Sequence, residues 1–329
     1  MKNNINTTSS GFIFYWHVAP DGKVTKLDFN NLDEDNFKRG YVWIHLNRSD
    51  PEVKKWLIRD PDIDETVTDS LLADDTRPRA TPHEEGVLLN LRGINLNPEG
   101  DPEDMVSMRL WIEPHRIVTV QNRNLRAIKS IQEQFVKKRA PRTPGDFVAD
   151  LSIHLVTNMS PTIVELNDKV DDLEEQVLDK DGSSLRTGLA ELRRTAIMLR
   201  RYLAPQRDAL NTLALQNLEW ITERDRLRLR EGGDQTTRVT EELEAVRERA
   251  AIVYDQLVDK RAEEMNRTML VLAVVTAVFL PLGLIAGMMG MNVGGMPLLD
   301  SSVGFWITVG LIALIGVLTV GVFKIMKWM

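Results

Sequence analysis

The sequence predicts an α+β chain in three parts: a cytoplasmic α/β domain over residues 1–142, a helical stalk over 143–267, and a transmembrane hairpin over 268–329. Three observations support this division. Short strand-like runs bounded by turn residues fill the first part, and long helical patterns fill the second. Two uncharged apolar runs fill the third part.

The first part mixes strand and helix signals. The runs GFIFYWHV and KVTKLDF are joined by Pro20-Asp21-Gly22, which predicts a β-hairpin. The run YVWIHL predicts a buried strand, and Asp50-Pro51 after it predicts a helix cap and first helical position. Further strands are predicted at GVLLNLRGINL, SMRLWIEP and RIVTVQ. We therefore expect a sheet flanked by helices, with a strand order that the sequence leaves open.

The second part is helical throughout in its pattern. We expect a helix over 146–177, a break at Asp181-Gly182, and a helix over 185–230 that Gly232-Gly233 closes. The next helix carries a heptad seam of apolar residues: Val239, Leu243, Val246, Ala250, Val253 and Leu257. Such a seam indicates either a coiled-coil stalk or a helix pair within one chain.

The third part contains two stretches long enough to cross a bilayer, 268–289 and 303–323, separated by a loop over 290–302. Its only charged residues are Asp300, Lys324 and Lys327. Further positive charges precede the first stretch, at Lys260, Arg261 and Arg267. The positive-inside rule then places both termini in the cytoplasm and the loop outside.

One face of the first stretch is small or weakly polar. Its residues, at helical spacing, are Asn266, Met269, Ala273, Thr276, Leu280, Gly283 and Gly287. Such a face indicates either close helix packing in lipid or the lining of a pore. Because two helices cannot enclose an aqueous path, a pore requires several copies of the chain.

Composition argues against several other classes of protein. The net charge of −7 argues against nucleic acid as a partner. There is no cysteine, and the five histidines are scattered, so a tight soft-ligand metal site is not expected. The sequence contains no HExxH, P-loop, GxSxG or CxxC motif, so neither an enzyme nor a cofactor is predicted. His83-Glu84-Glu85 is a weak metal candidate, better explained as an exposed loop.

The stretch KRAEEMNRTMLVLAVVTAVFLPLGLIAGMMGMN, the second apolar run and the terminal KxxKW together resemble the CorA superfamily of divalent-metal transporters. Gly290-Met291-Asn292 matches the signature of that family. The resemblance covers essentially the whole chain. It implies a funnel-shaped homopentamer in the cell inner membrane, with the first span of each subunit lining the pore.

Within the superfamily the chain resembles the ZntB zinc-transporter branch. The residues after the signature are Val293-Gly294-Gly295-Met296-Pro297, without a glutamate, and residues 94–111 and 199–210 are also similar to that branch. The resemblance implies Zn²⁺ as the transported ion and proton-linked uptake. Residues 268–299 contain no carboxylate or histidine, so a titrating group would lie elsewhere, or water and the metal's hydration shell would carry the proton.

The resemblance also implies which residues meet the ion. Asn292 would form a ring of amides at the outer mouth, and Asn266 a second polar ring. Apolar or weakly polar positions on or near the pore would be Leu280, Thr276, Leu272 and Met269, with Gly283 on the same face. Asp300 either concentrates cations at the mouth or is an ordinary solvated loop residue. Neutral amides can hydrogen-bond the water shell of a divalent ion without trapping it.

Two alternatives stay open from the sequence. One is a magnesium or cobalt channel of the CorA type; the absence of a glutamate in the loop after the signature argues against it. The other is a two-span membrane scaffold or sensor with a coiled-coil stalk, which the signature and the pore-like face disfavour.

Overall fold

The computed structural model describes residues 11–27, 39–74, 76–98, 100–179, 182–291 and 301–325. The chain forms two compact units, Met1–Val253 and Tyr254–Met329. The first unit holds the sheet and most of its covering helices, and the second holds the two long apolar helical segments. The predicted boundaries at 142 and 267 stay predictions.

The first unit is built on a single mixed sheet, for which the described residues supply seven strands in the order β2-β1-β3-β7-β6-β5-β4. The strands are β1 (Phe12–Val18), β2 (Val24–Leu27), β3 (Tyr41–Asn47), β4 (Arg79–His83), β5 (Gly86–Gly93), β6 (Val106–Ile112) and β7 (Arg116–Gln121). Among the described strands, β3 and β7 pair parallel, and all other neighbours pair antiparallel. The predicted hairpin is confirmed: β1 pairs with β2 antiparallel, and Gly22 turns the chain with φ +84°.

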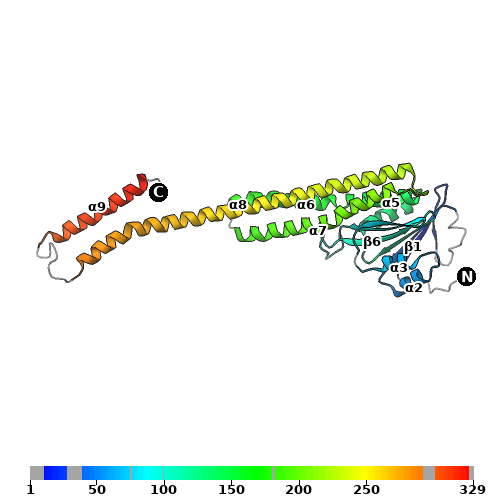
Figure 1. Cartoon of the computed structure of the whole chain (residues 1–329), viewed down its shortest axis with the longest axis horizontal. Coiled ribbons are helices and arrows are strands. Elements are labelled where there is room, and N and C mark those ends of the chain that lie inside the picture. The colour runs from blue at the N-terminus through cyan, green and yellow to red at the C-terminus, as the bar shows by residue number, and fades with distance from the viewer. Residues whose placement is uncertain are drawn as a thin grey trace. The chain divides into compact units, whose positions relative to one another are not determined.

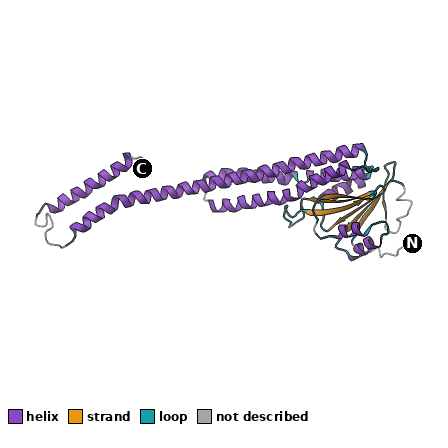
Figure 2. Ribbon diagram, viewed as in Figure 1, coloured by secondary structure: helices purple, strands orange, loops and turns teal. Residues whose placement is uncertain are grey.

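Helices cover both faces of this sheet, as Figures 1 and 2 show. The short helices α2 (Pro51–Arg59) and α3 (Glu65–Leu72) pack on one face. The other face is covered by α4 (Arg126–Val136), α5 (Pro144–Thr157) and part of α7 (Gly182–Leu215). Coverage on both sides explains why β3 and β7 read as nearly continuous buried runs rather than alternating ones.

Trp43 stands at the centre of the larger core. It is 0% exposed, and its ring lies 4.7 Å from Phe14, 4.8 Å from Phe135 and 4.8 Å from Phe147. Its indole N–H donates to Thr119 Oγ1 at 2.9 Å, so the one polar atom of the ring is satisfied. The cluster joins the sheet to α4 and α5.

Two predicted helix boundaries are wrong. The expected helix over 146–177 is broken at Asn158, which caps the end of α5, and α6 (Ser160–Asp179) follows. The expected helix over 185–230 ends at Leu215, and α8 (Glu223–Met289) begins after a short loop. Thr222 and Asp225 cap α8 reciprocally, each side chain accepting from the other's backbone N–H.

Gly232-Gly233 does not close a helix; it lies inside α8. A Cβ on Gly232 would stand 2.4 Å from Ser152 Oγ of α5, and one on Gly233 would stand 2.6 Å from Asn211 Oδ1 of α7. The two glycines therefore allow α8 to approach both helices closely, at the usual cost in helix propensity. A Gly-Gly pair, which was predicted to end a helix, here allows close packing between helices.

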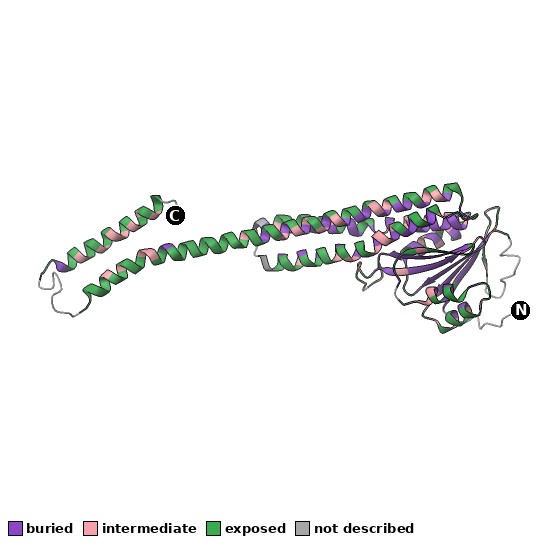
Figure 3. Cartoon of the chain, in the orientation of Figure 1, coloured by how far each residue is buried: buried purple, intermediate pink, exposed green. Residues whose placement is uncertain are grey.

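The heptad seam is buried within the chain from Val239 to Val253, as the buried stripe along α8 in Figure 3 shows. Ion pairs flank it: Arg200 of α7 lies 2.9 Å from Glu244, and Arg249 lies 2.9 Å from Glu174 of α6. For this part of the seam the structure supports the helix pair within one chain. A coiled coil between chains stays a prediction.

Arg228 joins the first turns of α8 to α5 through ion pairs with Asp146 and Asp150. Replacing Arg228 with Met leaves two half-buried carboxylates without a counter-charge, and we expect a loss of roughly 2 kcal/mol of stability. Thermal unfolding of the detergent-solubilised chain measures this loss. Arg230→Met removes an exposed arginine two residues away and is the matched control; equal melting temperatures for the two variants would contradict the assignment.

The buried side chain of His45 predicts how the stability of the first unit depends on pH. Burial lowers the pKa of His45 from 6.5 to about 3, and its Nδ1 lies 2.7 Å from Thr119 Oγ1. Between those two pH values the unfolded state binds a proton that the folded state does not, so stability falls as the pH falls, by at most about 1.4 kcal/mol per pH unit. We expect His45→Gln to flatten this slope in denaturant titrations between pH 7.5 and 4.5, whereas exposed His115→Gln keeps it.

Candidate ion path

Within the described parts of the chain, two segments could cross a membrane, and both lie in the second unit: the C-terminal part of α8 and helix α9 (Gly304–Ile325). Both are long and apolar enough to do so by length and composition. Among the described residues of 268–291 and 301–325, Lys324 is the single charged one. Figure 3 shows both segments as mostly exposed, with some intermediate residues, and their exposed surface is dominated by large apolar side chains. Such surface requires lipid or further protein to cover it.

One face of α8 in this unit is less exposed than the rest. Val274 is 8% exposed, and Ala277, Val278, Leu282 and Ile285 are half-buried. These positions recur every three or four residues, so they form one stripe along the helix. Leu282 Cδ1 lies 3.6 Å from where a Cβ on Gly316 of α9 would stand. This stripe is therefore the side of α8 that faces α9.

A matching stripe on α9 was not predicted from the sequence. Six of its less exposed residues follow a spacing of about four: Gly304, Thr308, Ile312, Gly316, Thr319 and Phe323; Ile315 and Gly321 are also half-buried. The two threonine hydroxyls donate to backbone carbonyls within the helix, at 3.0 Å and 2.8 Å, and leave the stripe without an unsatisfied donor. Glycine or threonine recurring at four-residue spacing is the signal that would have revealed it.

The predicted pore-lining residues lie on the opposite side of α8. Asn266, Met269, Leu272, Thr276, Leu280 and Gly283 are all exposed. At 100° per residue, Thr276 and Leu280 lie roughly 200° and roughly 240° around the helix from Val274. Five of them thus share one uncharged face, roughly 160–240° around the helix from Val274 and turned away from α9, and Asn266, at roughly 280°, lies at the edge of that face. That the face lines a pore stays a prediction.

On this face, Thr276 presents a hydrogen-bond acceptor rather than a donor. Its hydroxyl donates to the backbone oxygen of Leu272 at 2.8 Å. The lone pairs of Oγ1 therefore remain available to accept hydrogen bonds from water. A ring of such oxygens suits a hydrated cation, whose water molecules point their hydrogens outward.

The signature tripeptide begins where α8 ends. Gly290 follows the last helical residue, and its N–H donates to Ala286 O at 3.0 Å and Gly287 O at 3.2 Å. Met291 closes the same turn by donating to Met288 O at 3.3 Å. Asn292 and Asp300 lie outside the described residues, so their predicted roles stay predictions.

Over the described part of the chain, no group of three or more His, Asp or Glu side chains could hold a metal ion. The weak candidate His83 lies at the turn between β4 and β5, with Nε2 3.8 Å from Asp64 Oδ1. Its neighbours Glu84 and Glu85 are exposed. The described residues thus assemble an uncharged helical face rather than a chelating cluster.

Comparisons with known proteins agree with this architecture. The sequence model of a family described as "CorA-like Mg2+ transporter protein" matches residues 38–324. The chain is 37% identical over 290 residues to the divalent cation transporter CmaX of Pseudomonas aeruginosa, covering 88% of this chain and 87% of that one. It is 32% identical over 263 residues to the zinc transport protein ZntB of Yersinia enterocolitica, covering 80% of each. The full-length CmaX structure superposes with a TM-score of 0.83 at 33% identity, covering 98% of this chain and 100% of that one.

Single-cysteine variants test which side of α8 meets water, because the sequence has no cysteine of its own. We expect Thr276→Cys and Gly283→Cys to react with a charged, water-soluble thiol reagent at least about tenfold faster than Val274→Cys, since thiolates form in water and not in lipid or a packed interface. Labelling is followed by mass spectrometry on the membrane-embedded protein. Equal rates at the three positions would contradict a water-filled path on this face.

Proposed function

The chain belongs to the CorA-like family of Mg²⁺ transporter proteins, and from this premise we propose that it carries divalent cations, with Zn²⁺ preferred, across the cytoplasmic membrane. The observation that carries the proposal is the uncharged face of α8 from Asn266 to Gly283, which leads to the signature beginning at Gly290. Such a face lets a hydrated ion pass without a deep binding minimum. Transport rather than storage is the activity that suits it.

The path requires several copies of the chain. The described residues of one subunit supply two candidate membrane helices, and two helices cannot surround water. Leu280 is 71% exposed in the single chain, as are many other large apolar residues of the second unit. We infer a homopentamer in which α8 of each subunit lines the path and α9 packs outside it, toward lipid. In this arrangement both termini are cytoplasmic, as the positive charges at Arg267 and Lys324 favour.

In this proposal the polar rings act on the hydration shell of the ion. Amides of Asn292 at the outer mouth and Asn266 at the inner end hydrogen-bond to bound water, and Thr276 accepts between them. Leu280, Leu272 and Met269 form the narrow apolar sections. Asp300, repeated around the ring, raises the local cation concentration at the mouth.

Zinc is proposed over magnesium on two grounds. The loop after the signature has no acidic residue before Asp300, and one relative over 80% of this chain is named a zinc transport protein. Uptake linked to protons is proposed with it. Since residues 268–299 hold no carboxylate or histidine, the proton is carried by water, by the metal's hydration shell or by a group outside that stretch.

A second candidate is a CorA-type magnesium channel. The description of the matching family, which names Mg²⁺ and spans residues 38–324, favours it. The two candidates share the path and differ in the ion and in the effect of a pH gradient.

Flux into proteoliposomes separates the candidates. We expect Zn²⁺ influx to exceed Mg²⁺ influx and to rise when the proton gradient is directed inward with the ion. Gradient-independent flux dominated by Mg²⁺ would replace the zinc assignment with the channel. No flux of either ion would contradict transport altogether.

Asn292→Ala tests the outer ring. We expect it to reduce Zn²⁺ influx by at least about tenfold or to reduce the Zn²⁺/Mg²⁺ ratio, because the amides that hold the water shell are lost. Ser302→Ala, in the same loop, is the matched control. Subunit assembly is checked by native mass spectrometry, and normal flux and selectivity in Asn292→Ala would remove this residue from the path.

A further inference from the structure

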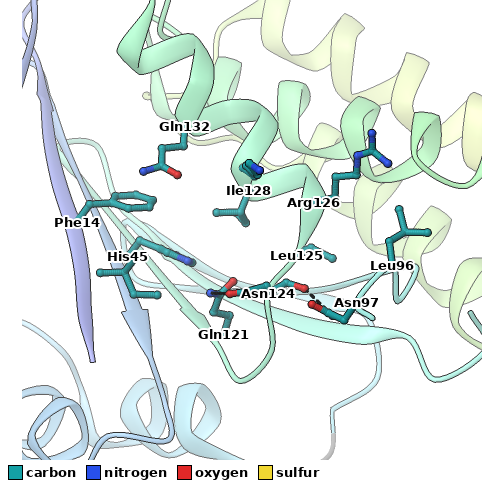
Figure 4. A pocket seen from close by; sticks show the side chains of 12 residues that line it. Phe14, His45, Leu96, Asn97, Gln121, Asn124, Leu125, Arg126, Ile128 and Gln132 are labelled. Carbon is teal, nitrogen blue, oxygen red and sulfur yellow. Dashed lines mark hydrogen bonds between the residues drawn. The ribbon is translucent and has the colours of Figure 1, made fainter. Parts of the chain in front are cut away.

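The first unit contains a pocket that ion transport does not use. Its volume is about 540 Å³, within the usual range for small-molecule sites. It lies where β1, β3 and β7 meet the start of α4, and Figure 4 shows its lining side chains. They are Ile13, Phe14, His45, Leu96, Asn97, Gln121, Asn124, Leu125, Arg126, Ile128, Lys129 and Gln132.

The floor of the pocket holds a buried amide that lacks a full set of partners. Gln121 is 6% exposed; its side chain interacts with the ring of His45, but its Oε1 makes no hydrogen bond of good geometry with the described residues. Its Nε2 reaches Asn124 Oδ1 only at 3.4 Å. A buried acceptor without a well-aligned donor is destabilising, so a ligand group in the cavity that donates to it would be favoured.

His45 makes the floor neutral as well as polar. Its pKa is lowered by burial to about 3, so the ring carries no charge at physiological pH. Phe14 stacks on it with ring centroids 4.8 Å apart and planes inclined by 26°. The floor therefore combines flat apolar surface with uncharged hydrogen-bonding edges, which suits a heterocyclic ring rather than a charged group.

The mouth of the pocket is positively charged, whereas the floor is neutral. Arg126 and Lys129 are exposed, lie one turn apart on α4, and line the pocket. The first turn of α4 has no side-chain cap, because Leu125 occupies the N-cap position. None of the twelve lining residues is acidic, in a chain whose net charge is −7. A helix start with two adjacent cations attracts a phosphate or similar anion.

We propose that this pocket binds a mononucleotide. The flat base lies on the floor, where it donates to Gln121 Oε1 and contacts Phe14 and His45. The phosphate lies at the mouth, on the first turn of α4 beside Arg126 and Lys129. The apolar side chains of Leu96, Leu125 and Ile128 cover the sugar. Every lining residue lies in the first unit, so the proposal is independent of the ion path.

Isothermal titration calorimetry on the full-length protein in detergent tests the proposal, with AMP as the probe and adenosine and inorganic phosphate as its two halves. We expect AMP to bind at least about tenfold more tightly than either half, since each half keeps only part of the contacts.

Lys129→Gln should weaken the binding of AMP about tenfold and leave the binding of adenosine unchanged, because it removes a charge-assisted contact to phosphate. Lys137→Gln, which removes an exposed lysine at the far end of α4, is the matched control and should bind AMP normally.

Gln121→Met tests the floor with nearly the same side-chain volume. We expect it to weaken both AMP and adenosine about tenfold, because the acceptor for the base is lost, and the melting temperature of the free protein shows whether the variant is folded. No binding of AMP at millimolar concentration would overturn the proposal. Equal affinity for AMP and inorganic phosphate would overturn the base site, and unchanged AMP affinity in both Lys129→Gln and Gln121→Met would overturn the pocket as the place of binding.

Discussion

The first unit depends on how closely α8 can pack on α5 and α7. Gly232 and Gly233 remove the side chains that would collide with Ser152 and Asn211, and Arg228 adds ion pairs to α5 beside them. Once the helix axis is held at that distance, the seam that begins at Val239 is buried between α6 and α7. Ridges and grooves interdigitate only at such short separations, so the apolar burial follows from the glycines.

The second unit follows a different rule, because its exposed surface is apolar and its polar groups are few. Hydroxyls of Thr276, Thr308 and Thr319 donate to carbonyls in their own helices, so these three donors need no partner outside the helix. On α8 this places an acceptor, and no charge, on the face opposite α9. A divalent ion that keeps its water shell needs acceptors of this kind and would be held too strongly by carboxylates.

The two units also separate two kinds of chemistry. The face of α8 is uncharged, extended and open, which suits passage of an ion. The pocket of the first unit is concave, with a neutral floor at Gln121 and His45 and a cationic mouth at Arg126 and Lys129, which suits retention of an organic anion. The two sites share no residue, so a variant of the pocket can be tested without changing the α8 face, and a variant of the α8 face without changing the pocket.

The sequence by itself determined whatever rests on local periodicity: the β1–β2 hairpin, the cap at Asp50, the two apolar runs and the shared face of Thr276 and Leu280. It misjudged Gly232-Gly233, since the same dipeptide ends one helix and permits close packing in another, and only the neighbours distinguish the two. The tertiary structure alone decided the parallel pairing of β3 with β7 and the burial of His45 and Gln121, because each of these joins residues more than seventy positions apart or depends on what covers them. Periodicity reports which side of an element is apolar, and only the fold reports what that side meets.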